Sequence, residues 1–107
     1  MVKISPDSNE ILIKMTTIDL TQYGPIIGNE TIAKKIFDII LAEAQIGEVE
    51  IDMKGIKLMA TFCAKQIFGG LYNSLGGERF YKHVTIINAS DNVKKTIGIG
   101  IEMSLTK

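Results

Sequence analysis

The hydrophobic and polar positions of the chain alternate in some stretches and recur at helical spacing in others. Near the N-terminus, Val2 and Ile4 alternate with polar residues, and residues 11–15 resume this alternation after a run of turn-forming residues. Because successive side chains of a strand point to opposite faces, the pattern predicts an N-terminal β-hairpin. The alternation then lapses from 17 to 29, which predicts an irregular and mobile connection.

Two later segments carry an apolar residue at every third or fourth position, the spacing that buries one face of a helix. The first stripe contains Ile32, Ile36, Phe37, Ile40, Leu41 and Ala44, and the second contains Ala64, Ile67, Phe68, Leu71 and Leu75. Asn29 or Thr31 can cap the first helix, which should end near Gly47. The second should begin at about residue 61 and end at the pair Gly76-Gly77, where a left-handed cap costs nothing sterically.

Between these helices, residues 48–53 alternate strictly. Three apolar side chains point one way and three carboxylates the other, namely Val49, Ile51 and Met53 against Glu48, Glu50 and Asp52. The alternation predicts a strand with one buried face and one wet face. A further short strand is predicted from His83 to Asn88, with His83 at its start.

The last segment fits two structures. Over residues 96–105 the apolar positions recur both at a spacing of four, as in a helix, and at a spacing of two, as in a strand. Gly98 and Gly100 disfavour the helix by about 1 kcal/mol each relative to alanine. A cap at Ser90 or Asp91, together with the helical stripe, favours it.

These elements predict one α/β domain spanning residues 1–107. Right-handed crossovers place successive helices on the same face of a sheet, so we expect a mixed sheet of about four strands with helices packed on one face. The polar side chains of residues 48–53 fit this arrangement, because strands covered on both faces are usually apolar throughout.

The charge of the chain excludes some partners. Twelve basic and twelve acidic residues cancel, and neither sign forms a long run, so we expect no binding of nucleic acid or of an anionic membrane. No apolar run approaches the roughly 20 residues that cross a bilayer. With a single cysteine, Cys63, and no leader peptide, a cytoplasmic location is expected.

Reactive constellations are scarce. Cys63 and His83 are the one pair that could supply a nucleophile and a base, although a buried cysteine usually behaves as a small hydrophobe. The acidic row of residues 48, 50 and 52 is the nearest candidate for a metal site, but its spacing equally suits a solvated strand face. The glycine pairs at 69–70 and 76–77 lack the lysine and spacing of a phosphate-binding loop. We therefore expect no catalytic residue, no metal and no cofactor, and a protein that is not an enzyme.

The central part of the chain resembles a known family. The order of strand, turn and helix over residues 48–92 is similar to the STAS domain (sulfate transporter and anti-sigma factor antagonist), and more closely to its bacterial STAS-like relatives of unassigned function. The resemblance rests on Asp52 at the strand end, Gly55-Ile56, the run from Ala64 to Gly69 that resembles the relatives' A-D-E-L-F-G, Leu75-Gly76 and Ile87-Asn88. It implies a mixed sheet with helices on one face, and it favours a helix for the last segment.

The resemblance also implies a switch. In anti-sigma factor antagonists the corner before the second helix carries D-S-S-G, whose second serine is phosphorylated by a histidine-kinase-like ATPase. These positions fall on Ala60, Thr61, Phe62 and Cys63, so Phe62 replaces the acceptor serine. Thr61 is then either a helix cap, worth about 1 kcal/mol, or a candidate phospho-acceptor. Phe62 is either a buried residue or, if exposed, an anchor for a protein partner.

We therefore expect a non-enzymatic signalling module that docks on a kinase-like ATPase or an anti-sigma factor. The expected docking residues lie in the corner from 54 to 65 and in the loop from 88 to 92, and they are Lys54, Lys57, Thr61, Phe62, Lys65 and Asn88.

Two other functions remain open. The alternative is a sensor of a small ligand, a nucleotide or a lipid, bound between the 54–61 loop and the 17–29 segment; an uncharacterised enzyme comes third. A homodimer through the uncovered sheet face is a further option, against which the charges at 48, 50 and 52 argue.

Overall fold

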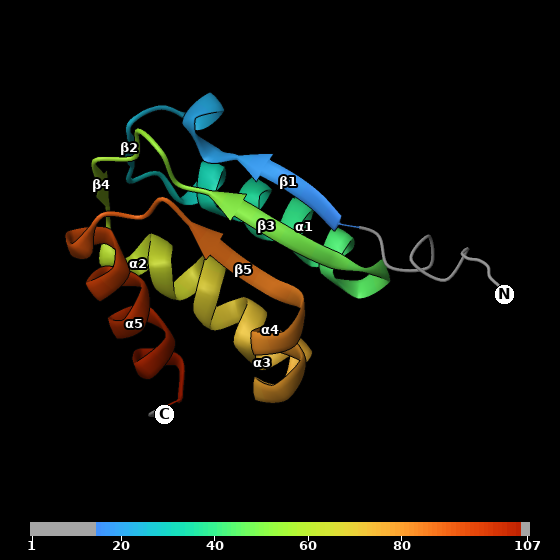
Figure 1. Ribbon diagram of the computed structural model, residues 1–107. Helices are drawn as coiled ribbons and strands as arrows, with labels where there is room; N and C mark the ends of the chain where they lie inside the picture. Colours follow the sequence, from blue (N-terminus) through green and yellow to red (C-terminus); the bar gives the residue numbers. More distant parts are fainter. Residues whose placement is uncertain (1–14, 106–107) are drawn as a thin grey trace, which may run out of the picture.

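The computed structural model describes residues 15–105 and is built around a three-stranded parallel sheet (Figure 1). Its strands are β1 (Met15–Asp19), β3 (Glu48–Asp52) and β5 (Val84–Ile87), with β3 in the centre. The predicted N-terminal hairpin falls mainly outside the described residues, as does the antiparallel strand that would make this sheet mixed. The predicted α/β class is confirmed.

The two faces of the sheet differ in the way that residues 48–53 predict. Val49 and Ile51 of β3 are fully buried, and α1 (Glu30–Ile46) lies behind β1 and β3 in Figure 1. On the opposite face, Thr17 of β1 donates a hydrogen bond to Glu50 of β3 over 3.2 Å. The helices therefore cover the apolar face, and polar side chains occupy the other.

The first helix, α1, begins and ends where the sequence predicts. The Oδ1 atom of Asn29 accepts hydrogen bonds from the backbone N–H groups of Thr31 and Ile32, at 2.8 and 3.1 Å. These bonds satisfy two of the donors left free in the first turn of a helix. The helix ends at Ile46 with Gly47 as its C-cap, and it buries Ala33, Ile36, Ile40 and Ala44.

The second predicted helix is interrupted by a π-helical turn. It runs through α2 (Thr61–Ala64), the π segment (Lys65–Gly69) and α3 (Gly70–Leu75), and the N–H of Gly70 donates to the carbonyl of Lys65, five residues earlier. All five residues of the predicted apolar stripe are buried. Gly76, with a φ of 85°, ends α3 as expected.

A short helix, α4 (Gly77–His83), follows at once and was not predicted. The N–H of Phe80 donates to the carbonyl of Gly76 over 2.9 Å, so the chain turns at Gly76 and re-enters a helix. His83 is consequently the last residue of α4 and not the first residue of a strand. The hydrophobic pattern does not reveal this helix, because Phe80 is the only buried residue among its seven.

The segment from 17 to 29 is more regular than predicted. Asp19 caps a 3-10 turn, η2 (Leu20–Tyr23), by accepting from the N–H of Thr21. The chain then forms β2 (Ile26–Ile27), which pairs in parallel with β4 (Leu58–Met59). Leu20 and Ile27 are both almost fully buried, so the connection is anchored in the core.

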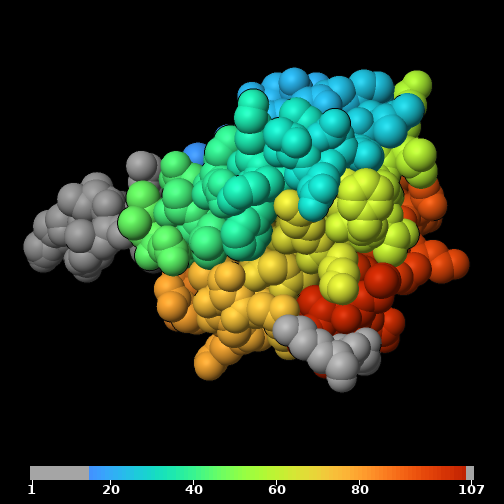
Figure 2. Space-filling model, turned by 180° about the vertical axis from the view of Figure 1, so that it is seen from behind, coloured from blue at the N-terminus to red at the C-terminus, as the bar shows by residue number. Residues whose placement is uncertain are grey.

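The last element is a helix, α5 (Asp91–Leu105), with Ser90 accepting from the N–H of Val93 over 3.2 Å. Gly100 lies against the second helix: a Cβ atom there would come within 2.6 Å of the backbone carbon of Ala64. The glycine therefore permits close packing of two helices. Figure 2 shows this side of the molecule, where α1 (teal to green), residues 61–75 (yellow) and α5 (red) lie beside one another.

Candidate functional site

The carboxyl ends of β3 and β5 meet beside a hollow of about 700 Å³. Two loops line it: residues 53–57, which follow β3, and residues 88–90, which follow β5. Lys54, Lys57 and Asn88, three of the predicted docking residues, belong to these loops. Because parallel strands end at the same edge of a sheet, residues 35 positions apart in the chain, such as Asp52 and Ile87, become neighbours here.

Asp52 joins the two loops. Its Oδ1 atom accepts a hydrogen bond from the backbone N–H of Lys54 at 2.9 Å and another from the side-chain amide of Asn88 at 3.0 Å. The Asn88 amide is the main reason that the pKa of Asp52 lies below its usual value, and the Lys54 N–H adds to the effect. Sequence reasoning missed this role, because alternation alone placed Asp52 in a solvated row.

Asn88 holds a backbone conformation that few residues adopt. Its φ is 60°, and it is the only described residue other than glycine with a positive φ. Asparagine tolerates this region better than most residues do. The strand end Ile87-Asn88, which belongs to the family resemblance, therefore combines a special turn with the bond to Asp52.

Phe62 and Lys65 lie at a different hollow, of about 440 Å³, between α1, the second helix and α5. Phe62 is 54% exposed, which decides between the two interpretations of this residue in favour of exposure. The other lining residues are Glu30, Gln66, Gly70, Asn73 and Ser104. The six predicted residues thus divide into one group at each hollow, with Thr61 next to Phe62.

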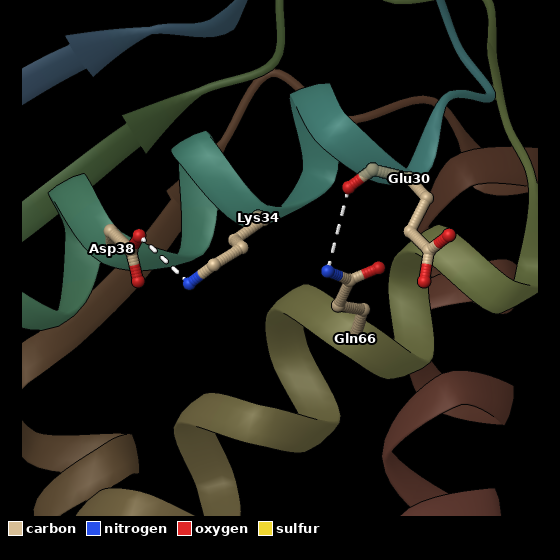
Figure 3. A network of polar contacts seen from close by, with 4 residues as sticks. All are labelled: Glu30, Lys34, Asp38 and Gln66. Atoms are coloured by element: carbon tan, nitrogen blue, oxygen red, sulfur yellow. Dashed lines mark hydrogen bonds and ion pairs between the residues drawn. The ribbon is translucent and has the colours of Figure 1, made fainter.

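Two polar contacts lie on α1 and beside this second hollow (Figure 3). The side-chain amide of Gln66 donates to the backbone carbonyl of Glu30 over 3.5 Å and so links the π segment to the start of α1. One turn further along α1, Lys34 pairs with Asp38 at 3.3 Å, and both side chains are mostly exposed. Phe62 and the start of α1 thus border the same hollow, and Gln66 bonds across it to Glu30.

Thr61 is exposed and is the first residue of α2. The cap position belongs to Ala60, and the helix start has no side-chain cap hydrogen bond. The interpretation of Thr61 as a helix cap is therefore wrong. Its hydroxyl lies at the surface in the first turn of the second helix.

Cys63 and His83 are not brought together. Cys63 is fully buried, with its thiol 3.8 Å from the carbonyl of Asn29, and burial raises the pKa of that thiol. The Nδ1 atom of His83 lies 2.8 Å from the carbonyl of Gly47, which immediately precedes β3. Asn29 and Gly47 flank the two ends of α1, so the thiol and the imidazole lie at opposite ends of that helix.

Two other arrangements that the sequence left open do not occur within residues 15–105. No group of three or more His, Cys, Asp or Glu side chains is arranged to hold a metal ion, so the acidic row of β3 forms no such cluster. The space expected between the 17–29 and 54–61 segments is closed by backbone hydrogen bonds. The N–H of Lys57 donates to Pro25 over 2.7 Å, and the N–H of Ala60 donates to Ile27 over 2.8 Å.

Comparison with known proteins identifies the class of the chain. The model of the family described as a STAS-like domain of unknown function matches residues 33–94. The match covers more than half of the sequence, so the chain belongs to the STAS-like domain family. No curated protein and no solved structure matches it. None of the helices between residues 15 and 105 combines the length and the apolar composition that a membrane span requires.

Proposed function

We propose that the chain is a non-enzymatic signalling module that docks on a protein partner through the corner from Lys54 to Lys65, in the manner of an anti-sigma factor antagonist. Phe62 carries this proposal. Its side chain is 54% exposed, whereas the next two residues, Cys63 and Ala64, are fully buried. Aromatic side chains are the commonest anchors of protein interfaces, and exposing one costs hydrophobic free energy in the isolated protein.

The family resemblance supports a partner of the histidine-kinase-like ATPase or anti-sigma class. Lys54, Lys57 and Asn88 extend the docking surface along the edge of the sheet, and Lys65 borders Phe62 on the second helix. Charged residues at the rim of an interface mainly set the rate and specificity of association. In this arrangement Phe62 provides the anchor and the lysines orient the partner.

Thr61 is the candidate regulatory residue of this surface. A phosphate carries a charge of about −2, and at the first turn of a helix it leaves the helix intact while it changes the surface. Phosphorylation of Thr61 would therefore act on docking and not on folding. Thr61→Glu should weaken partner binding, whereas Thr61→Val should leave it unchanged; equal binding by both variants would exclude regulation at Thr61.

A non-enzymatic role is supported by the separation of Cys63 from His83. Each is engaged with a backbone carbonyl, and Cys63 is fully buried with a raised pKa. A thiol in this state is a poor nucleophile, because the thiolate is the reactive form. Cys63 and His83, the candidate nucleophile and base, are therefore not arranged for catalysis with each other.

The test is capture from the native lysate with three immobilised proteins: the wild type, Phe62→Asp and Ile46→Asp. Ile46 is a matched control, because it is 64% exposed and lies at the far end of α1. We expect an ATPase of the histidine-kinase-like class, or an anti-sigma factor, to bind the wild type and Ile46→Asp and to be lost with Phe62→Asp. The captured protein is then purified and titrated against all three.

Two results would contradict the docking proposal. If Phe62→Asp still captures the same partner, Phe62 is not the anchor of the interface. If the wild type captures no protein of either class, the family resemblance does not extend to this docking function.

A second candidate function is the binding of a small anionic ligand such as a nucleotide. The hollow between the 53–57 and 88–90 loops favours it, because Lys54 and Lys57 lie at its rim and it is large enough for a small molecule. The residues that line this hollow include none of the 17–29 segment.

The sensor function is tested by thermal unfolding in the presence of individual nucleotides. A ligand that binds only the folded state raises the melting temperature. We expect any such increase to disappear when Lys54 and Lys57 are both replaced by alanine, with Lys34→Ala as the control. If no nucleotide raises the melting temperature of the wild type, this candidate is excluded.

A further inference from the structure

The outward face of α5 combines apolar side chains, a glycine and two opposite charges. Lys95 and Glu102 are seven residues apart, and Gly98 and Ile99 lie three or four residues from each of them, so all four share one stripe of the helix. All four are exposed, while the opposite stripe of Val93, Ile97, Gly100 and Ser104 is buried against the rest of the protein. The outward stripe therefore lies at the surface of a single chain.

A groove of about 420 Å³ runs beside this stripe, between α4 and α5. Its apolar lining includes Tyr81, Ile99 and Leu105, which are 70%, 40% and 52% exposed. Tyr81 is held in place although it is exposed, because its ring makes edge contacts with Phe80 at 5.2 Å and Tyr72 at 5.9 Å. A contiguous patch of ordered apolar side chains at a surface is a feature of interaction sites.

The contacts within one chain do not explain why position 98 is a glycine. A Cβ atom at Gly98 would meet nothing within 4 Å, whereas at Gly100 it would collide with the backbone of the second helix. Glycine in the middle of a helix is unfavourable, so an unneeded one suggests a requirement from outside the chain. A second helix lying close against α5 supplies that requirement.

We propose that α5 is the two-fold interface of a homodimer, in which two copies of the helix pack antiparallel with the axis near Gly98 and Ile99. In a two-fold interface the same patch meets itself. Lys95 and Glu102 lie three residues to either side of the pair 98–99, so each Lys95 comes level with Glu102 of the second copy. The stripe is therefore complementary to itself in charge.

Two further observations favour a second copy as the occupant. The formal net charge of the chain is zero, so no overall repulsion keeps two copies apart. On the uncovered sheet face, by contrast, a two-fold contact would bring the carboxylates of β1 and β3 together. The stripe begins after residue 94, where the family match ends, so the proposal concerns this chain and not the family as a whole.

The test compares the self-association of charge variants by sedimentation equilibrium. For the wild type we expect a mass approaching twice the 11.8 kDa of one chain at high concentration. Lys95→Glu and Glu102→Lys each turn two attractive contacts into repulsive ones, so each should weaken the dimer about tenfold. An equimolar mixture of these two variants restores both attractions in a heterodimer, and so does the double variant.

This pattern cannot come from misfolding, because two damaged proteins would not repair each other on mixing. Ile99→Asp should abolish the dimer, while Met15→Asp, at a position on the sheet face that is 52% exposed, should leave it unchanged. A wild type that is monomeric up to about 1 mM would overturn the proposal. So would single variants that associate like the wild type, a mixture that fails to recover, or a dimer that Met15→Asp breaks and Ile99→Asp does not.

Discussion

Asn88 combines a positive φ with a side-chain bond to Asp52, and these two properties can be separated by mutation. Asn88→Gly keeps the backbone conformation, because glycine adopts positive φ freely, but it removes the amide. The amide stabilises the charged form of Asp52, so its loss should raise the pKa of that carboxyl toward its usual value. NMR titration of the side-chain carboxyl measures this directly.

Lys57→Ala is the control for this titration, because Lys57 lines the same hollow but is not among the causes of the shift at Asp52. An unchanged pKa in Asn88→Gly would mean that the Lys54 N–H alone holds the carboxylate.

Gly98 and Gly100 lie two residues apart in α5 and should respond oppositely to alanine. At Gly98 the new methyl group has open space, so helix propensity should stabilise the monomer by about 1 kcal/mol. At Gly100 the Cβ atom would lie 2.6 Å from the Ala64 backbone, so α5 must shift and the chain should lose about 1–3 kcal/mol. Urea denaturation at concentrations where both variants are monomeric gives both values.

Equal stability of the two variants would show that α5 does not pack as described. The same pair of variants also tests the dimer proposal, because Gly98→Ala should weaken self-association while it increases the stability of the monomer.

At the scale of elements, the pairing of β2 with β4 ties the 17–29 segment to the corner that carries Phe62. Ile26 and Ile27 are consecutive in β2, yet Ile26 is 60% exposed and Ile27 only 1%. Ile27→Ala should therefore cost about 2–5 kcal/mol of unfolding free energy, as buried isoleucines do. Ile26→Ala should cost less than about 0.5 kcal/mol.

The comparison needs only equilibrium denaturation of the two variants and the wild type. Similar costs at both positions would mean that the segment lies on the surface without entering the core.

At the scale of the whole molecule, the two proposals predict a stoichiometry. The groove beside α5 shares no lining residue with either hollow of the corner. A dimer formed through α5 therefore leaves both copies of Phe62 accessible, and two partner molecules should bind per dimer. Light scattering of the complex should give a 2:2 mass for the wild type and a 1:1 mass for Ile99→Asp.

A wild-type complex with one partner per dimer would indicate that the second corner is blocked, and hence that the dimer uses another surface.

Much of the fold could be predicted from the sequence because its long elements have strong periodic patterns. The stripe of α1, its cap at Asn29 and the alternation of β3 all depend on residues near each other in the chain. The short elements could not be predicted in this way. β2 and β4 have two residues each, too few for any period, and exist because each pairs with a segment about 30 positions away.

The candidate site was predictable in position but not in its contacts. The family resemblance indicated the corner and the loop after β5, and the parallel strands bring Lys54, Lys57 and Asn88 together there. The separation of Phe62 from these residues, and the role of Asp52 in joining the loops, depend on side-chain directions in space. Alternation gave Asp52 a solvent-facing position, and no local pattern records its bond to Asn88.

The π-helical turn at 65–69 accommodates one residue more than a regular helix would hold between α2 and α3. A bond across five residues takes up one residue more than the four-residue bond of an α-helix. Loss of a single codon within this turn would therefore leave a regular helix in which Thr61 and Phe62 keep nearly the same direction relative to α3, whereas the same loss in a regular part of the helix would rotate them by about 100° around its axis. A related lineage could thus lose a residue at 65–69 and still present its anchor in the same direction.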